Sequence, residues 1–159
     1  MAKTDYRRGD LSGMGGFVPL PYSVLDSAAY LSLGPSAVKL LFDVYRQYSG
    51  KNNGSLSPCW ELMQKRGWKS PNTLSNAKKE LRASRLITVT RQGTKGVNGT
   101  AELWAVNWLS LDWRSDFDID PKGHDHMGYV DLKINPDVEQ DQRKLRLVKT
   151  ALKAAKKTA

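Results

Sequence analysis

The feature that most constrains the fold of this chain is a helix-start signal that occurs twice around a short turn. Ser57-Pro58 and Ser70-Pro71 each place a capping hydroxyl before a proline, a composition typical of helix N-termini. The tripeptide Gly67-Trp68-Lys69 lies between the two expected helices, and its glycine favours a break. The sequence therefore predicts two consecutive helices joined by a tight turn, the second running to about Ser84.

Apolar spacing predicts which faces of the helices are buried. A helix is expected to begin at Leu33-Gly34-Pro35-Ser36, and a shorter one to run from Tyr22 to Tyr30 behind Pro21. In the helix after Ser70, the buried stripe is expected to be Leu74, Ala77 and Leu81. In the helix after Gly34 the expected buried face follows the same spacing rule and consists of Val38, Leu41, Phe42, Tyr45 and Tyr48.

Two strands are expected after the last helix. Residues 86–91 (LITVTR) alternate and are rich in β-branched side chains, and residues 102–108 (ELWAVNW) form a second apolar run. The segment between them contains three glycines and an Asn-Gly pair, which favours a hairpin turn. A short apolar link at Ser55-Leu56 adds a further extended segment. The chain is therefore expected to belong to the α+β class.

This order of elements resembles a winged helix-turn-helix domain. The resemblance covers roughly Leu33 to Trp113 and rests on the paired Ser-Pro starts, the Gly67-Trp68-Lys69 turn and the LITVTRQG…ELWAVNW hairpin. The sequence of residues 50–87 is similar to those of small DNA-binding proteins of phages, plasmids and other mobile elements, including replication-initiator-like proteins and repressors. The resemblance implies a three-helix core with a β-hairpin wing.

The resemblance also implies a set of DNA-binding residues. In such domains the second helix of the motif, here Ser70 to Arg85, lies in the major groove, and the wing touches the backbone. Asparagine can pair with adenine, and lysine and arginine reach phosphates or base edges. The candidates on the turn, the helix and the hairpin are Lys69, Ser70, Asn72, Thr73, Asn76, Lys79, Arg91 and Lys95.

Charge divides the chain into blocks. The 159 residues include 25 Lys and Arg against 16 Asp and Glu, a net charge of +9 that favours an anionic partner such as nucleic acid. Residues 57–99 are strongly basic, residues 110–141 are acidic, and residues 142–159 carry seven basic side chains and no acid. We therefore expect a flexible arm (1–16), a winged-helix domain (17–113), an acidic linker (114–136) and a basic C-terminal helix or tail (137–159).

Other classes of function find little support. Cys59 is the only cysteine, so no internal disulfide forms, and without a secretory signal at the start the expected compartment is the reducing cytoplasm. No stretch is apolar enough for a membrane helix. His124 and His126 stand among Asp116, Asp118 and Asp120, but we interpret this stretch as a solvated acidic loop. No catalytic residue, metal or cofactor is expected.

Three functions remain open from the sequence. The first is sequence-specific binding of double-stranded DNA in the control of transcription or replication, as a homodimer. The second is a winged-helix module that docks an acidic protein or a nucleic-acid-processing complex, which it blocks or recruits. The third, binding of RNA or single strands, is disfavoured by the scarcity of exposed aromatic residues. The basic tail is expected to pack back as a helix on the domain or on a second copy, to grip an anion, or to lack fixed structure alone.

Overall fold

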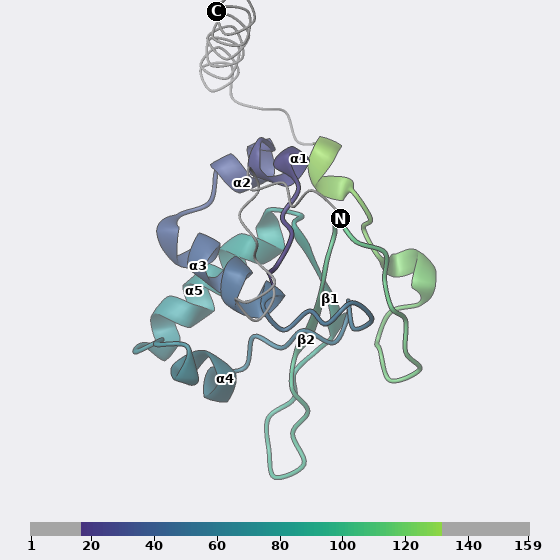
Figure 1. The fold of residues 1–159 in the computed structure, drawn as a ribbon. Helices are drawn as coiled ribbons and strands as arrows, with labels where there is room; N and C mark the ends of the chain where they lie inside the picture. The colour runs from purple at the N-terminus through teal and green to yellow at the C-terminus, as the bar shows by residue number, and fades with distance from the viewer. Residues whose placement is uncertain (1–16, 132–159) are drawn as a thin grey trace, which may run out of the picture.

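The computed structural model describes residues 17–131 (Figure 1). The expected arm 1–16, residues 132–136 and the expected tail 137–159 lie outside the described residues. The described part begins with two single-turn helices, α1 (Tyr22–Leu25) and α2 (Ala28–Leu31). A single helix over 22–30 was expected, but Ser27 is extended and its side chain accepts a hydrogen bond from the backbone N–H of Tyr30. Ser27 therefore begins a new helix instead of continuing the first.

Helices α3 (Pro35–Tyr45) and α5 (Pro71–Ala83) pack against each other and form the centre of the fold (Figure 1). The expected stripe on α5 is confirmed, since Leu74, Ala77 and Leu81 are all buried. The expected face of α3 is partly wrong, because Phe42 is 43% exposed and Tyr48 lies beyond the end of the helix. The buried apolar side chains of α3 are Ala37, Leu40, Leu41, Val44 and Tyr45, a face rotated from the expected one.

Helix α4 (Trp60–Lys65) starts later than its Ser-Pro signal indicates. Its N-cap position is Cys59, which makes no side-chain capping hydrogen bond. Ser57 is instead buried, and its backbone groups pair with the side chain of Gln47: the Ser57 N–H donates to Oε1 at 2.9 Å, and its carbonyl accepts from Nε2 at 2.8 Å. The prediction that Ser57 caps this helix is therefore wrong, because its backbone is tied to the end of α3.

The two expected strands pair as an antiparallel hairpin. β1 (Ile87–Arg91) and β2 (Leu103–Val106) pair Ile87 with Val106 and Val89 with Trp104, and the register shifts between Val89 and Arg91. Leu56 adds an isolated bridge to Trp104, which confirms the short extended segment between the helices. The molecule is thus mixed α+β, with helices α3, α4 and α5 beside a two-stranded hairpin (Figure 1).

The acidic segment after the hairpin is folded onto it. Two short 3-10 helices, η3 (Pro121–Gly123) and η4 (Gly128–Asp131), lie in this segment. The N–H of Asp118 donates to the Thr90 carbonyl at 2.8 Å, and Tyr129 is 1% exposed within the core cluster. Over residues 114–131 the linker interpretation is therefore corrected, because burial and hydrogen bonds make this stretch part of the folded unit.

The core joins all of these elements. Its largest fully buried side chains include Trp104 and Tyr45, and the Tyr45 ring meets the Trp108 ring edge-on, 5.0 Å between centroids. Asn53 is fully buried, and its amide nitrogen donates to the carbonyls of Val106, Leu109 and Ser110. Within residues 17–131, no helix has the length and apolar character that crossing a bilayer requires.

Candidate nucleic-acid interface

The start of α5 is fixed by its own sequence. The Ser70 hydroxyl accepts a hydrogen bond from the backbone N–H of Thr73 at 3.3 Å, so Ser70 is an N-cap as expected. Gly67 has a φ of +86° in the turn before it, a left-handed conformation that glycine adopts without strain. The Glu80 carboxylate accepts a hydrogen bond from the N–H of Gly34 and ties α5 to the start of α3. These contacts hold the outer face of α5 in a defined orientation.

That outer face carries four of the candidate residues. Because Leu74, Ala77 and Leu81 face the core, the opposite side of the helix is left to solvent. Asn72, Thr73, Asn76 and Lys79 are all exposed there. The structure therefore brings these four onto one accessible helix face, as the apolar stripe predicted. A rigid helix with protruding amides and a lysine is the shape that fits the major groove of B-DNA.

Two other basic residues of α5 are held within the protein. Lys78 Nζ lies 3.4 Å from one oxygen of Glu102, and Arg82 pairs with the other oxygen. Glu102 also accepts a hydrogen bond from the indole N–H of Trp104 at 2.6 Å. Burial alone would raise the pKa of Glu102, but the hydrogen bonds from Arg82 and Trp104 outweigh it and hold the pKa below its ordinary value. Lys78 and Arg82 therefore fasten α5 to the hairpin.

The loop between β1 and β2 projects from the body of the molecule (Figure 1). Its base is braced by two threonines: the N–H of Thr94 donates to the Thr100 carbonyl at 3.0 Å, and the N–H of Thr100 donates to the Thr94 hydroxyl at 2.8 Å. Gly96 has a φ of +123°, which allows the tight turn beyond Lys95. Lys95 is exposed on this loop, as a residue that contacts a backbone phosphate must be.

Arg91, the other hairpin candidate, is not a free cation. Its Nη1 lies 2.8 Å from the Asp116 carboxylate, and its Nε donates to the Ala101 carbonyl at 3.2 Å. Asp116 is shared with Arg114, whose Nε lies 2.8 Å from it. The Arg91 side chain is 23% exposed. The sequence analysis did not predict this pair, because Asp116 lies in the stretch interpreted as a linker.

Lys69 lies at a shallow pocket of about 260 Å³ beside the start of α5. The pocket is also lined by Lys39 and by Trp68, which is 6% exposed and whose indole N–H donates to Asp43 at 2.9 Å. Lys39 pairs with Asp43 as well, and its Nζ lies 5.1 Å from the centroid of the Trp68 ring. Burial of Trp68 fixes the turn, so Lys69 is presented at a constant place next to the helix N-terminus.

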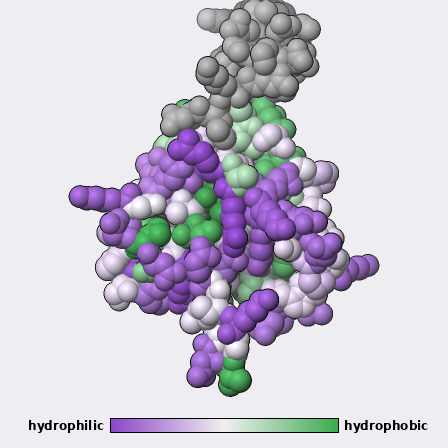
Figure 2. Space-filling model, turned by 180° about the vertical axis from the view of Figure 1, so that it is seen from behind, coloured by the Kyte–Doolittle hydropathy of each residue, from purple (hydrophilic) through white to green (hydrophobic). Residues whose placement is uncertain are grey.

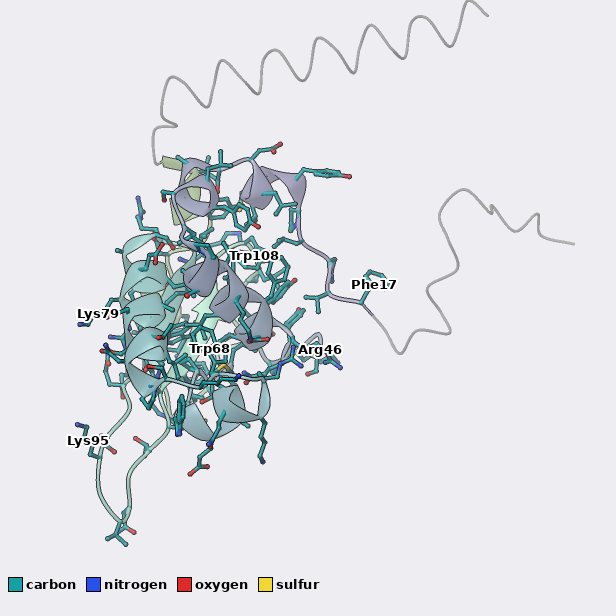
Figure 3. The ribbon with its side chains drawn as sticks, turned by 90° about the vertical axis from the view of Figure 1, so that its left-hand side faces the viewer. Phe17, Arg46, Trp68, Lys79, Lys95 and Trp108 are labelled. Carbon is teal, nitrogen blue, oxygen red and sulfur yellow. The ribbon has the colours of Figure 1, made fainter. Side chains whose placement is uncertain are left out.

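The candidate cations thus fall into two groups. Lys69, Lys79 and Lys95 are exposed, and no salt bridge forms at any of them within residues 17–131, whereas Arg91 is paired. Figure 3 shows Lys79 and Lys95 pointing from α5 and from the hairpin loop toward the same side of the molecule. Figure 2 looks onto that side, and most of its surface is hydrophilic. We call Lys69, Lys79 and Lys95 the free lysines, and they mark the cationic part of the candidate interface.

The histidine-containing stretch has structural contacts. Asp125 binds Arg85 with two hydrogen bonds, each of 2.9 Å, and these hold the pKa of Asp125 below its ordinary value. His124 Nε2 lies 3.0 Å from the Leu109 carbonyl, and burial is the main cause that lowers the pKa of His124. In the part of the chain that the structure describes, no three His, Cys, Asp or Glu side chains gather as a metal-binding group would require.

Comparisons of the chain with protein-family models, with curated proteins and with solved structures give no match. The case for a function therefore rests on the residues themselves. The sequence did not predict which acids neutralise basic side chains; in the structure they are Asp43, Glu102, Asp116 and Asp125. Asp116 and Asp125 lie in the acidic block, whose charge is opposite to that of the basic block, whereas Asp43 and Glu102 lie outside it.

Proposed function

We propose that this protein binds double-stranded DNA, with α5 in the major groove and the hairpin loop against the neighbouring backbone, in the manner of a winged helix-turn-helix domain. The observation that carries the proposal is the distribution of unpaired charge. Five basic side chains of the basic block are held by acids of the protein. Of the four that form no salt bridge within residues 17–131, three are the free lysines on the turn, on α5 and on the loop, and the fourth is Lys65 at the end of α4. The five held side chains are Arg66, Lys78, Arg82, Arg85 and Arg91.

The roles of the candidates differ in this proposal. Asn72 and Asn76 are the residues that read base edges, since an asparagine amide can donate to and accept from adenine at once. The free lysines contact phosphates, which position the protein without reading sequence. Arg91 takes no part while Asp116 holds it. The resemblance to mobile-element proteins supports a role in the control of transcription or replication, by occupation of a DNA site.

A salt titration of binding tests the proposal. Fluorescence anisotropy of a labelled random duplex is measured with the wild-type chain, with the Lys79→Glu/Lys95→Glu variant and with a Lys51→Glu/Lys122→Glu control. The control has the same net charge, and its exposed residues lie outside α5 and the hairpin loop. Each lost phosphate contact lowers the slope of log K against log salt by about 0.9.

We expect the Lys79→Glu/Lys95→Glu variant to lose most of its binding and about two units of slope, while the control keeps nearly the wild-type slope. Equal losses in the two variants would show that only net charge matters and would remove α5 and the loop from the interface. Absence of binding by the wild type at low salt would refute the proposal altogether.

A further inference from the structure

A second concave surface lies between α3 and α4, apart from the free lysines. It is a groove of about 350 Å³, lined by the end of α3 on one side and by α4 on the other. Figure 3 shows Arg46, at this groove, on the opposite side of the molecule from Lys79 and Lys95. A duplex lying along α5 and the hairpin loop would therefore leave the groove open to another partner.

The groove has an apolar floor. Leu62 lines it and is 39% exposed, and Met63 beside it is 1% exposed and belongs to the core. Phe42 is 43% exposed on α3 one helical turn before Arg46, so the two share a face of that helix. An exposed leucine in the groove, with an exposed phenylalanine on the same face of α3 as Arg46, indicates a surface that another apolar group can cover.

The rim of the groove carries excess positive charge. Asp43 is its one acidic lining residue, and it is already saturated: it pairs with Lys39, with Arg66 at 3.0 Å and with the indole N–H of Trp68. Arg46 and Lys65 also line the groove, and neither forms a salt bridge within the described residues. Two unpaired cations therefore flank an apolar floor.

We propose that this groove docks an acidic amphipathic segment of a partner protein, whose apolar side chains cover Leu62 and whose carboxylates pair with Arg46 and Lys65. The volume is at the lower end of the range of ligand pockets, so it admits a few side chains of a helical or extended segment. A nucleic acid would use the cations but would leave the apolar floor uncovered. Charge complementarity together with the floor therefore favours an acidic, amphipathic protein segment.

The probe is a fluorescein-labelled synthetic peptide of about 15 residues, with Leu and Phe at i, i+3 and i+7 among Glu and Asp. Its control has the same composition with the apolar residues dispersed around the helix. Binding to the full chain is measured by anisotropy, and the contact surface is mapped by amide chemical shifts of the ¹⁵N-labelled protein. The variants are Arg46→Glu/Lys65→Glu, Leu62→Ser and, as a control at the other surface, Lys79→Glu/Lys95→Glu.

We expect the patterned peptide to shift amides of α4 and of the end of α3, and to bind at least about tenfold more weakly to Arg46→Glu/Lys65→Glu. Leu62→Ser should weaken peptide binding by a similar factor and leave duplex binding intact. Intact duplex binding would also show that this variant is folded. The Lys79→Glu/Lys95→Glu variant should bind the peptide as the wild type does and should lose duplex binding.

Three outcomes would overturn the proposal. They are peptide shifts that map to α5 and the hairpin loop, equal binding of the patterned and dispersed peptides, or no peptide binding at millimolar concentration. Loss of duplex binding in Arg46→Glu/Lys65→Glu, beyond that of the charge-matched Lys51→Glu/Lys122→Glu control, would assign the rim cations to nucleic acid instead. Because the two surfaces have separate variants, failure of the groove leaves the DNA-binding proposal standing, and the reverse holds too.

Discussion

Asp116→Asn should strengthen the binding of DNA. The substitution keeps the shape of the side chain and removes the charge that holds Arg91 at 2.8 Å. Arg91 is the last residue of β1, paired with Leu103 next to the hairpin loop, so a released guanidinium can join the free lysines in contacting phosphate. Affinity should therefore increase although nothing has been added to the protein.

The size of this effect follows from two contributions. A negative charge about 8 Å from a phosphate repels it by about 0.5 kcal/mol in water, so its removal strengthens binding about twofold. A new contact between Arg91 and a phosphate adds about 0.9 to the slope of log K against log salt. Together we expect a gain of about three- to tenfold at about 0.1 M salt. The cost in stability is at most about 1 kcal/mol, because both partners of the Arg91–Asp116 pair are partly exposed.

The assay is anisotropy of a labelled duplex at several salt concentrations, with Glu61→Gln as a charge-matched control. Glu61 is exposed in the first turn of α4, and no salt bridge forms at it within residues 17–131. The control should change affinity slightly and leave the slope unchanged. If Asp116→Asn and Glu61→Gln gave the same affinity and the same slope, the Arg91–Asp116 pair would have no bearing on DNA binding.

Three further predictions concern stability. Leu81→Ala should lower the free energy of unfolding, measured in urea, by about 2–5 kcal/mol, because the Leu81 side chain is fully buried where α5 packs on the core. An unchanged midpoint would contradict the packing of α5. Ser70→Ala should cost about 1 kcal/mol through loss of the cap, and Ser70→Gly less. Asp43, Glu102 and Asp125 have lowered pKa values in the folded state. Their ionised carboxylates therefore stabilise the folded protein at a pH above the ordinary carboxyl pKa, which is near 4. This contribution to the free energy of unfolding is lost as the pH falls through the lowered pKa values. The urea midpoint should therefore be lower at pH 3 than at pH 7, and the difference between the two midpoints should be smaller in Glu102→Gln.

The elements that the sequence predicted are those with a strong local signal. The Leu74, Ala77 and Leu81 stripe follows helical spacing, and the Ser70 cap needs only three neighbouring residues. The β1–β2 hairpin follows from alternation and an Asn-Gly turn. These signals are contained in short windows, and at these three places no distant contact overrides them.

The errors arose where distant residues decide the structure. Phe42 is as apolar as its neighbours, and only the approach of α5 onto α3 selects the Leu40 and Val44 side of the helix. Ser57 has the composition of a cap, but Gln47, ten residues earlier, takes its backbone groups. Asp116 was assigned to a linker because charge blocks suggest separate parts, although blocks of opposite sign also attract.

The exposed face of α5, with Asn72, Thr73, Asn76 and Lys79, likewise combines a feature that the sequence predicts and one that it does not. Their exposure was predictable, since it is the complement of an apolar stripe that spacing alone defines. Which basic residues stay unpaired was not predictable, because this depends on acids up to 40 residues away, as in the Arg85–Asp125 pair. The structure therefore reduces the cations of the candidate interface to the free lysines.

The most direct test of the central claim compares Asn76→Ala with Lys95→Ala on a selected site and on random duplex DNA. Asn76 is exposed on α5, and Lys95 is exposed on the hairpin loop. If α5 reads bases, Asn76→Ala should cost about 1–3 kcal/mol on the selected site and little on random DNA. Lys95→Ala should weaken both duplexes alike and lower the salt slope by about one. Equal losses from Asn76→Ala on the two duplexes would contradict base reading by α5.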